Sequence, residues 1–168
     1  MTSSRGAGKP VSASRVTMTE LVIAEDTNAL GNIFGGRVMA LIDKAASVVA
    51  LRHARTQVAT ASVDQLVFIS PIRLGTIVVL EAWLNAVFRT SMEVGVRVES
   101  EDSLTGERRH TTTAYVTMVA IDASGRPVSA PPLILESDSD RKRAAEAERR
   151  RAIRLENRIR GDSGPGPS

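Results

Sequence analysis

The sequence of 168 residues contains no cysteine, which excludes disulfide bonds, a thiol nucleophile and a cysteine zinc site. The sequence has two histidines, His53 and His110. It therefore offers few candidates for a multi-histidine metal site or for a Ser-His-Asp triad. No run of about 18 apolar residues occurs, so we expect no helix that spans a membrane. The first residues also lack the apolar segment of a secretory signal.

Only the two ends of the chain carry a net positive charge. The net charge is +3, and residues 1–17 carry three basic residues and no acidic one, while residues 138–168 carry nine basic and six acidic ones. Residues 18–137 carry ten basic and thirteen acidic residues. A nucleic-acid-binding domain shows a basic patch within its fold, so nucleic acid is not an expected partner.

The composition predicts three regions. Residues 1–17 are rich in Ser, Gly and Arg and are expected to form a disordered leader. Residues 18–137 form the folded body. Residues 138–168 form a charged tail, in which Ala, Arg and Glu favour a surface helix that frays, followed by a flexible end at 161–168.

The pattern of apolar residues in the folded body predicts one helix and several strands. Residues 37–55 contain no Gly or Pro and are apolar on nearly all sides, which is typical of a buried helix. Residues 92–99 alternate strictly between apolar and other residues, as in a strand with one wet face. Further strands are expected at 20–25, 57–69, 76–88 and 110–121.

The predicted fold class is α+β, with a curved antiparallel sheet wrapped around one long central helix. Short connections favour antiparallel strands, and the sheet is the element available to cover the helix. A single sheet leaves its edge strands and one flank of the helix open, so we expect two protomers to pair through these surfaces.

Asp43 is the most unusual residue of the predicted helix. Its neighbours three and four positions away are small or apolar and include no cation: Met39, Ala40, Ala46 and Ser47. A carboxylate without a partner is costly in apolar surroundings, and such groups cluster at functional sites. The alternative is that Asp43 faces a solvent-filled gap or pairs with an arginine from elsewhere.

The loop before the helix ends in Gly35 and Gly36. Glycines let the backbone approach a ligand closely, and the first N–H groups of a helix lack intrahelical acceptors. Such a site can stabilise negative charge on a carbonyl oxygen, although a Gly-Gly pair before a helix is in most proteins only structural.

Residues 26–43, DTNALGNIFGGRVMALID, resemble the signature of the acyl-CoA thioesterases of the hotdog superfamily, in the branch that includes the cytosolic acyl-CoA hydrolases. The resemblance extends over about residues 19–135 through five further segments: ATASVDQLVF (59–68), SPIRLG (70–75), RTSMEV (89–94), EDSLTGER (101–108) and YVTMVAID (115–122). It implies the hotdog fold, hydrolysis of fatty acyl-CoA to fatty acid and CoA, and a cytoplasmic location. It also implies a homodimer as the minimal unit, assembled into a hexameric trimer of dimers, with no cofactor, because CoA is part of the substrate and product.

The resemblance also implies roles for single residues. Asp43 would be the catalytic residue, as a general base or as a nucleophile that forms a mixed anhydride. Asn32 of the opposite protomer would orient water or the carbonyl, and the N–H groups of Gly35 and Gly36 would receive the oxyanion. A shared site fits the spacing, because residues 36 to 43 span about 10 Å along a helix.

The remaining implied contacts concern the two ends of the substrate. Thr90 and Ser91 match a pair that lies near the CoA in such folds. Relatives often have a small or polar residue just before this pair, and Arg89 at this position could contact a CoA phosphate or simply point to water. Met39 and Leu41 would help to line the acyl channel.

Two other functions remain open at this point: a catalytically weak acyl-CoA sensor, and binding of nucleic acid or an anionic surface by the Arg-rich tail. A dehydratase of the same fold would need a histidine for proton transfer. His53, about 15 Å along the helix from Asp43, is too far away for this role.

Overall fold

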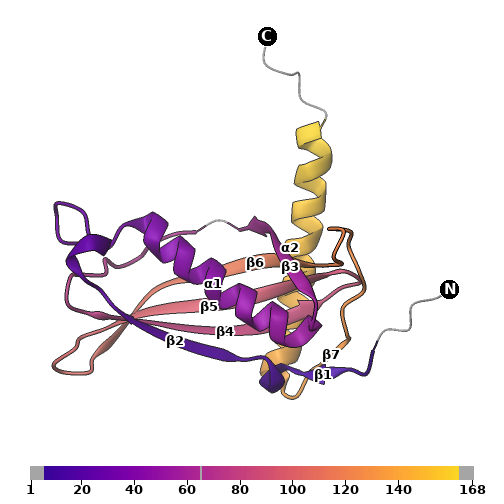
Figure 1. Cartoon of the computed structure of the whole chain (residues 1–168), viewed down its shortest axis with the longest axis horizontal. Helices are drawn as coiled ribbons and strands as arrows, with labels where there is room; N and C mark the ends of the chain where they lie inside the picture. The colour runs from indigo at the N-terminus through magenta and orange to yellow at the C-terminus, as the bar shows by residue number, and fades with distance from the viewer. Residues whose placement is uncertain (1–5, 65, 163–168) are drawn as a thin grey trace, which may run out of the picture.

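Five strands form one curled antiparallel sheet in the computed structural model, which describes residues 6–64 and 66–162 (Figure 1). Their spatial order is β2 (Val16–Leu21), β4 (Ile77–Val87), β5 (Ser91–Glu101), β6 (Arg108–Ile121) and β3 (Gln57–Val63). The sheet curls around α1 (Gly35–Ala54). The predicted α+β fold, a curved antiparallel sheet around one central helix, is therefore confirmed.

The helix α1 fills the inside of the sheet with one of its faces. Eight of its residues are buried: Val38, Leu41, Ile42, Ala45, Ala46, Val49, Ala50 and His53. They pack against alternate residues of the central strands, such as Val94 and Val96 of β5, as expected where one strand face is covered. The helix ends at Ala54, and the residue that follows, Arg55, has a left-handed φ of 55°.

The strands differ from the sequence prediction in bounds and in neighbours. The first strand was expected at 20–25 but lies at Val16–Leu21, and a short 3-10 helix, η2 (Ala24–Asp26), follows it. The β3 strand pairs with β6, not with β4, which follows it in the sequence. The connection across 64–76 is long enough to carry the chain to the other side of the sheet.

The leader is ordered where the structure describes it, so the prediction of disorder is wrong for residues 9–17. The strand β1 (Lys9–Pro10) pairs in parallel with β7 (Leu133–Ile134), and η1 (Val11–Ala13) follows. Val11 is only 5% exposed. The polar composition did not reveal this order, because the segment is held by two buried valines, Val11 and Val16, and by pairing with a distant strand. Residues 1–5 lie outside the described part.

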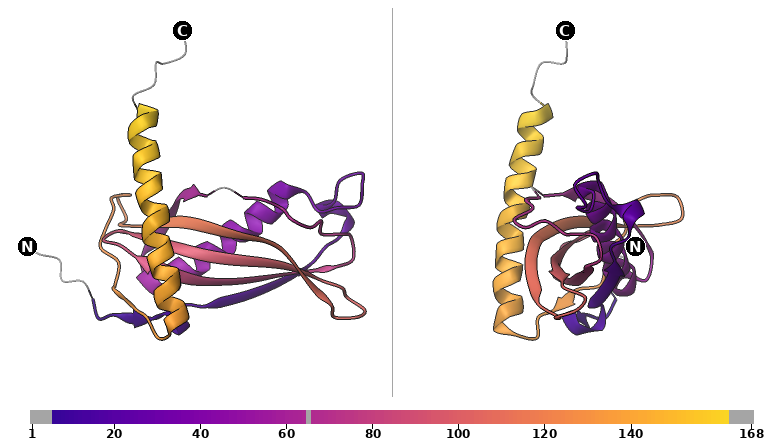
Figure 2. Two further views of the ribbon diagram at one scale, coloured as in Figure 1. Left: turned by 180° about the vertical axis from the view of Figure 1, so that it is seen from behind. Right: turned by 90° about the vertical axis from the view of Figure 1, so that its left-hand side faces the viewer.

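The charged tail forms a second long helix, α2 (Asp138–Asp162), on the outer face of the sheet, and part of it projects past the sheet (Figure 2). It is bound more firmly than a fraying surface helix. Glu93 of β5 is fully buried and accepts hydrogen bonds from Arg150 at 2.7 Å and Arg154 at 3.2 Å. Most of the predicted flexible end, residues 163–168, lies outside the described residues.

Among residues 6–64 and 66–162, no helix is both long and apolar enough to cross a membrane.

Candidate active site

Asp43 lies on the flank of α1 that the sheet does not cover. Gly36, Met39 and Ala40 are exposed on this flank, and Asp43 is half-buried. The helix was predicted to be buried on nearly all sides, but Met39 is 47% exposed. Leu41 is 1% exposed and points into the core. Leu41 therefore cannot line an acyl channel beside Met39, because the two side chains lie on opposite sides of the helix.

Thr60 of β3 is the partner that the sequence did not reveal for Asp43. Its hydroxyl donates a hydrogen bond to Asp43 Oδ1 at 2.6 Å. The second oxygen, Oδ2, has no hydrogen-bond partner in the described part of the chain. The ladder between β3 and β6 shifts register between Thr60 and Ser62, so the bond sits beside a β-bulge, a feature that often re-aims side chains near active sites. The hydroxyl fixes the carboxylate and leaves one oxygen open for chemistry.

The start of α1 presents free hydrogen-bond donors. No side chain caps the helix and its first turn holds no acidic residue. The N–H groups of Gly35 and Gly36 have no acceptor within the described residues, and nothing lies within 4 Å of a Cβ built on Gly36. The one charged residue of this turn, Arg37, is neutralised by Asp26 at 2.9 Å and by Glu20. The positive end of the helix dipole is thus open to an anion.

Asn32 and Asp43 are not joined within one chain: no hydrogen bond links them in the described part. Asn32 is half-buried and lines a small, mostly apolar cavity of about 180 Å³ together with Gly35 and Phe68. A second asparagine shapes the same loop. Asn28 Oδ1 accepts hydrogen bonds from the N–H groups of Leu30 at 2.9 Å and Asn32 at 3.2 Å.

Thr90 and Ser91 lie in a different cavity, on the outer face of the sheet. It has a volume of about 770 Å³ and is called the α2 groove here. Its lining comes from the end of β3, the start of β5, β6 and α2: Ala61, Ser62, Val63, Asp64, Phe88, Thr90, Ser91, Thr117, Val119, Pro127, Arg151, Arg154, Leu155, Asn157 and Arg158. Arg89, predicted beside Thr90 and Ser91, is exposed and does not line it. The arginines of α2 were not predicted.

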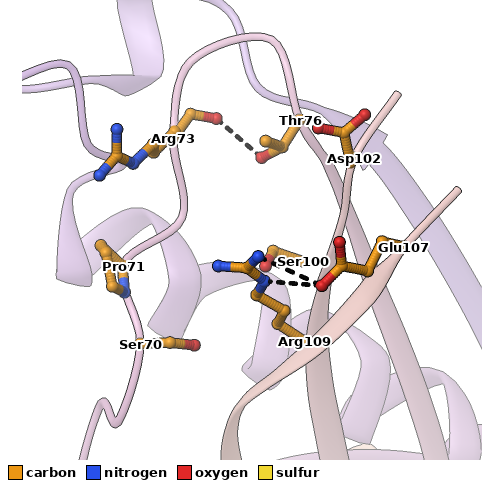
Figure 3. A pocket seen from close by; sticks show the side chains of 8 residues that line it. All are labelled: Ser70, Pro71, Arg73, Thr76, Ser100, Asp102, Glu107 and Arg109. Atoms are coloured by element: carbon orange, nitrogen blue, oxygen red, sulfur yellow. Dashed lines mark hydrogen bonds and ion pairs between the residues drawn. The ribbon is translucent and has the colours of Figure 1, made fainter. Parts of the chain in front are cut away.

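A third cavity, of about 360 Å³, lies by the turn between β5 and β6 (Figure 3). Arg109 pairs there with Glu107 at 3.2 Å. None of the predicted site residues lines this cavity, and we assign it no part in the chemistry. Its lining residues are Ser70, Pro71, Arg73, Thr76, Ser100, Asp102, Glu107 and Arg109.

His53 is a buried residue near the end of α1. It is fully buried, and its Nε2 lies 2.8 Å from the carbonyl oxygen of Pro131. Burial lowers the pKa of His53 below its usual value, and the positive charge of Lys9 acts in the same direction, against the hydrogen bond to Pro131. Because a carbonyl only accepts, the neutral ring carries its proton on Nε2.

Known proteins resemble the chain over most of its length. A family model described as Thioesterase superfamily matches residues 30–107. The uncharacterized acyl-CoA thioester hydrolase YkhA of Bacillus subtilis is 40% identical over 127 residues, which cover 76% of this chain and 74% of that protein. The cytosolic acyl coenzyme A thioester hydrolase of Rattus norvegicus is 30% identical over 94% of this chain, but this chain spans only 42% of its length.

Solved structures show the same architecture. An apo-hexameric acyl-CoA thioesterase is 41% identical, with a TM-score of 0.84 over 95% of this chain and 99% of that chain. The acyl-CoA hydrolase of Staphylococcus aureus, solved with butyryl coenzyme A, coenzyme A and coenzyme A disulfide, is 33% identical, with a TM-score of 0.85 over 92% and 94%. The same hydrolase was also solved as variants in which one aspartate, one asparagine or one threonine is replaced by alanine.

Proposed function

The chain belongs to the thioesterase superfamily, and we propose that it is a cytoplasmic acyl-CoA thioester hydrolase that releases fatty acid and CoA from fatty acyl-CoA. The observation that carries the proposal is the hydrogen bond from Thr60 to Asp43 on the open flank of α1. Thioester hydrolysis needs a carboxylate in reach of the carbonyl carbon and donors for the oxyanion. Both are present on one side of this helix.

Asp43 acts on the acyl carbon in one of two ways. As a general base, it takes a proton from water, whose oxygen attacks the carbonyl carbon while the CoA sulfur leaves. As a nucleophile, it attacks the carbon itself and forms an anhydride that water then hydrolyses. In both routes the hydrogen bond from Thr60 holds Oδ1 and leaves Oδ2 to react. No cofactor takes part in either route.

The first N–H groups of α1 receive the oxyanion. Gly35 and Gly36 offer donors without intrachain acceptors, and the dipole of a 20-residue helix adds positive potential at this end. Within one chain, however, these donors lie about two helical turns from Asp43. A loop contributed by a second protomer therefore completes the site.

The assembly we propose is a homodimer, arranged as a trimer of dimers. A single protomer leaves the outer flank of α1 and the edge strands β2 and β3 open. Large apolar side chains are exposed near the glycine loop: Leu30, Phe34, Met39, Phe68 and Ile69. Hexameric thioesterases are found among the structural neighbours, including one from Yersinia pestis.

Two asparagines are candidates for the amide that the second protomer contributes. Asn32 lines the cavity beside Gly35. Asn28, Asp43 and Thr60 are the same three residue types, at the same mutual spacing, as those replaced in the Staphylococcus aureus variants. Because of this agreement, Asn28 is a second candidate for the amide beside Asn32, although no sequence motif pointed to it.

Turnover of acyl-CoA thioesters of increasing chain length, followed by thiol release, tests the proposed function. We expect hydrolysis of fatty acyl-CoA with a preference for one range of chain length. Binding of the whole series with no thiol release would instead identify a sensor and would contradict the proposal.

Mixing inactive variants tests the shared site. Asp43→Ala protein is combined with Asn32→Ala or with Asn28→Ala protein under conditions that exchange subunits. A random mixture restores one intact site in half of the dimers, so roughly a quarter of wild-type activity returns for the asparagine that acts across the interface. If confirmed exchange restores activity for neither asparagine, the site is not shared in this way.

Thr60→Val tests the role of the hydroxyl. The variant removes one hydrogen bond to a charged group, and we expect kcat to fall by about one to two orders of magnitude with KM nearly unchanged. Thr56→Val is the matched control, because the Thr56 hydroxyl donates to the carbonyl of Ile121 and not to Asp43. Equal losses in both variants would remove Thr60 from the mechanism.

A further inference from the structure

The β-bulge in β3 separates two residues that point to opposite faces of the sheet. Thr60 stands opposite Met118 of β6, which belongs to the inner core, and the Thr60 hydroxyl donates to Asp43 of α1. Asp64 directly follows β3, and its carboxylate accepts a hydrogen bond from Arg154 of α2 at 2.8 Å. Because α1 lies inside the curl of the sheet and α2 lies outside it, this one segment contacts both long helices (Figure 2).

The bulge makes these two contacts possible in one strand. In a regular strand, residues separated by an even number of positions lie on the same face, so Thr60 and Asp64 would point the same way. The register shift between Thr60 and Ser62 inserts one residue into β3 and reverses the alternation beyond it. Val63 accordingly stands opposite Val116, a residue of the inner core, and Asp64 points outward to α2. If the bulge lay elsewhere, one of the two polar side chains would lose its partner.

The backbone pairing of β3 does not by itself determine where the bulge sits. β3 is an edge strand and pairs only with β6 within the described part of the chain. A bulge leaves one residue out of the ladder, and a strand that slips by one residue turns its side chains to the other face. Beyond the bulge, the N–H group of Asp64 donates to the carbonyl oxygen of Tyr115 at 3.0 Å. Backbone bonds of this kind form in any register, so side-chain contacts on both sides of the bulge select the register of β3.

Arg154, which binds the outer end of this segment, is held in place independently of Asp64. The same nitrogen, Nη1, also donates to the carboxylate of Glu93 at 3.2 Å. Glu93 is fully buried and is bound in addition by Arg150 at 2.7 Å. The side chain of Arg154 is 20% exposed, so its ion pairs are partly shielded from water and salt. Its guanidinium is therefore a fixed donor on the outer face, next to the end of β3.

Resting on the proposed hydrolysis, we propose that Asp64 and Arg154 are positioning residues, whose ion pair on the outer face fixes the bulge of β3. The bulge in turn holds the Thr60 hydroxyl on the carboxylate of Asp43. Asp64 lies four residues after Thr60, about 13 Å along a strand, so the ion pair acts through the backbone of β3 and not on the reacting atoms. The α2 helix thus contributes to catalysis from the opposite face of the sheet.

A double-mutant cycle with Thr60 tests this role. Asp64→Ala removes the ion pair and leaves Glu93 bound to both arginines of α2. We expect kcat for acyl-CoA to fall about 5- to 10-fold, with KM changed by less than about twofold. Asp64→Ala/Thr60→Val should have the kcat of Thr60→Val alone, within about twofold, because the ion pair has no hydroxyl left to position. Losses that multiply would mean that Asp64 acts by another route and would overturn the proposal.

Further variants separate positioning from a general effect on α2. Asp64→Asn keeps an oxygen that accepts from Arg154 without the charge, so it should lose less activity than Asp64→Ala. Arg154→Ala should lower kcat at least as much as Asp64→Ala, and the Asp64 variants decide the question if Arg154→Ala does not fold. Arg143→Ala is the matched control, because this α2 arginine is 30% exposed and lies over Trp83 of β4, away from β3. It should keep kcat within about twofold of the wild-type value, and an equal loss there overturns the proposal.

Amide hydrogen exchange of β3, measured by mass spectrometry, is a readout that does not depend on turnover. We expect residues 57–63 to exchange about 10-fold faster in Asp64→Ala than in the wild type, because the strand loses the contact that selects its register. The control Arg143→Ala should exchange at the wild-type rate in this segment. Exchange and kcat that both stay at the wild-type values in Asp64→Ala would show that strand pairing alone holds Thr60, and would overturn the proposal.

The two proposals fail in different ways. If the wild-type protein hydrolyses no acyl-CoA but β3 exchanges faster in Asp64→Ala and not in Arg143→Ala, the proposed hydrolysis is wrong and the link between β3 and α2 stands. If the wild-type protein is active and Asp64→Ala has the same kcat, the positioning role is wrong and the hydrolysis stands.

Discussion

The two long helices lie on opposite faces of one sheet and are held there by different forces. α1 buries eight residues, most of them small or apolar, inside the curl. α2 buries little beyond Ala147 and Asp140, and is bound through the ion pairs of Arg150 and Arg154 with Glu93. Burial of apolar area is non-directional, whereas a bidentate ion pair fixes the orientation of a helix.

This difference explains where the functional groups lie. The apolar face of α1 supplies enough burial to hold the helix, so its outer flank is free to carry Asp43 and the open N–H groups of Gly35 and Gly36. On α2, Arg150 and Arg154 fix the helix, and Arg151 and Arg158 are left to face the groove. On each helix, one face holds the helix against the sheet and another is left open.

The largest expected effect is on catalysis, from Asp43→Asn on the free flank of α1. Loss of the base or nucleophile should lower kcat by about 10²- to 10⁴-fold. Because Asp43 is half-buried and outside the core, the free energy of unfolding should change by less than about 1 kcal/mol. Steady-state kinetics and urea unfolding measure the two quantities. An active variant would show that Asp43 is not needed for catalysis. A variant that loses most of its stability would show that the outer face of α1 also holds the fold together.

On the outer face of the sheet, Glu93→Ala should destabilise the fold by about 3–5 kcal/mol, because it leaves Arg150 without its carboxylate partner against the sheet and leaves Arg154 with Asp64 alone. Urea unfolding at a fixed protein concentration measures the loss. The control Glu107→Ala breaks an exposed pair with Arg109 and should cost less than about 1 kcal/mol. A small loss for Glu93→Ala would mean that α2 is not held by this network.

On the inner face, Leu41→Ala should cost about 2–5 kcal/mol, from lost burial and from the cavity left behind. Lys44→Ala, on the exposed side of the same helix, is the control and should stay within about 0.5 kcal/mol. The double variant Leu41→Ala/Glu93→Ala should equal the sum of the single losses within about 0.5 kcal/mol, because the two sites lie on opposite faces and share no partner. Strong coupling would show that the two faces do not act independently.

The smallest expected effect is a pH dependence at the buried end of α1. Burial lowers the pKa of His53 in the fold, so the unfolded chain binds a proton first as the pH falls below about 6.5. The stability contributed by neutral His53 is present above that pH and is lost as the pH falls through the lowered pKa. Unfolding at pH 7.5 and at pH 5.5 measures the difference, which His53→Gln should reduce. If the variant shows the same difference in stability between the two pH values, His53 is not the cause of the pH dependence.

The periodic patterns of the sequence predicted α1 and the strands of the sheet, and the short connections predicted that the strands are antiparallel. The alternation of residues 92–99 lies within β5, and the predicted helix 37–55 differs from α1 by two residues at its start and one at its end. These features are local: each depends on which side chains recur on one face. The resemblance of residues 26–43 added Asp43 as a catalytic candidate, and that role remains a proposal.

The contacts that define the candidate site and bind α2 depend on residues far apart in the chain. Thr60 meets Asp43 through the β-bulge in an edge strand, and Arg150 meets Glu93 across 57 positions. The composition of residues 138–168 predicted a fraying helix, because composition shows how many charged residues a segment has and not which residues they pair with. A local pattern encodes which face of an element is apolar, but the partner of a polar side chain is set by strand register and helix docking. Only the folded chain decides those, because burial of the whole core selects them together.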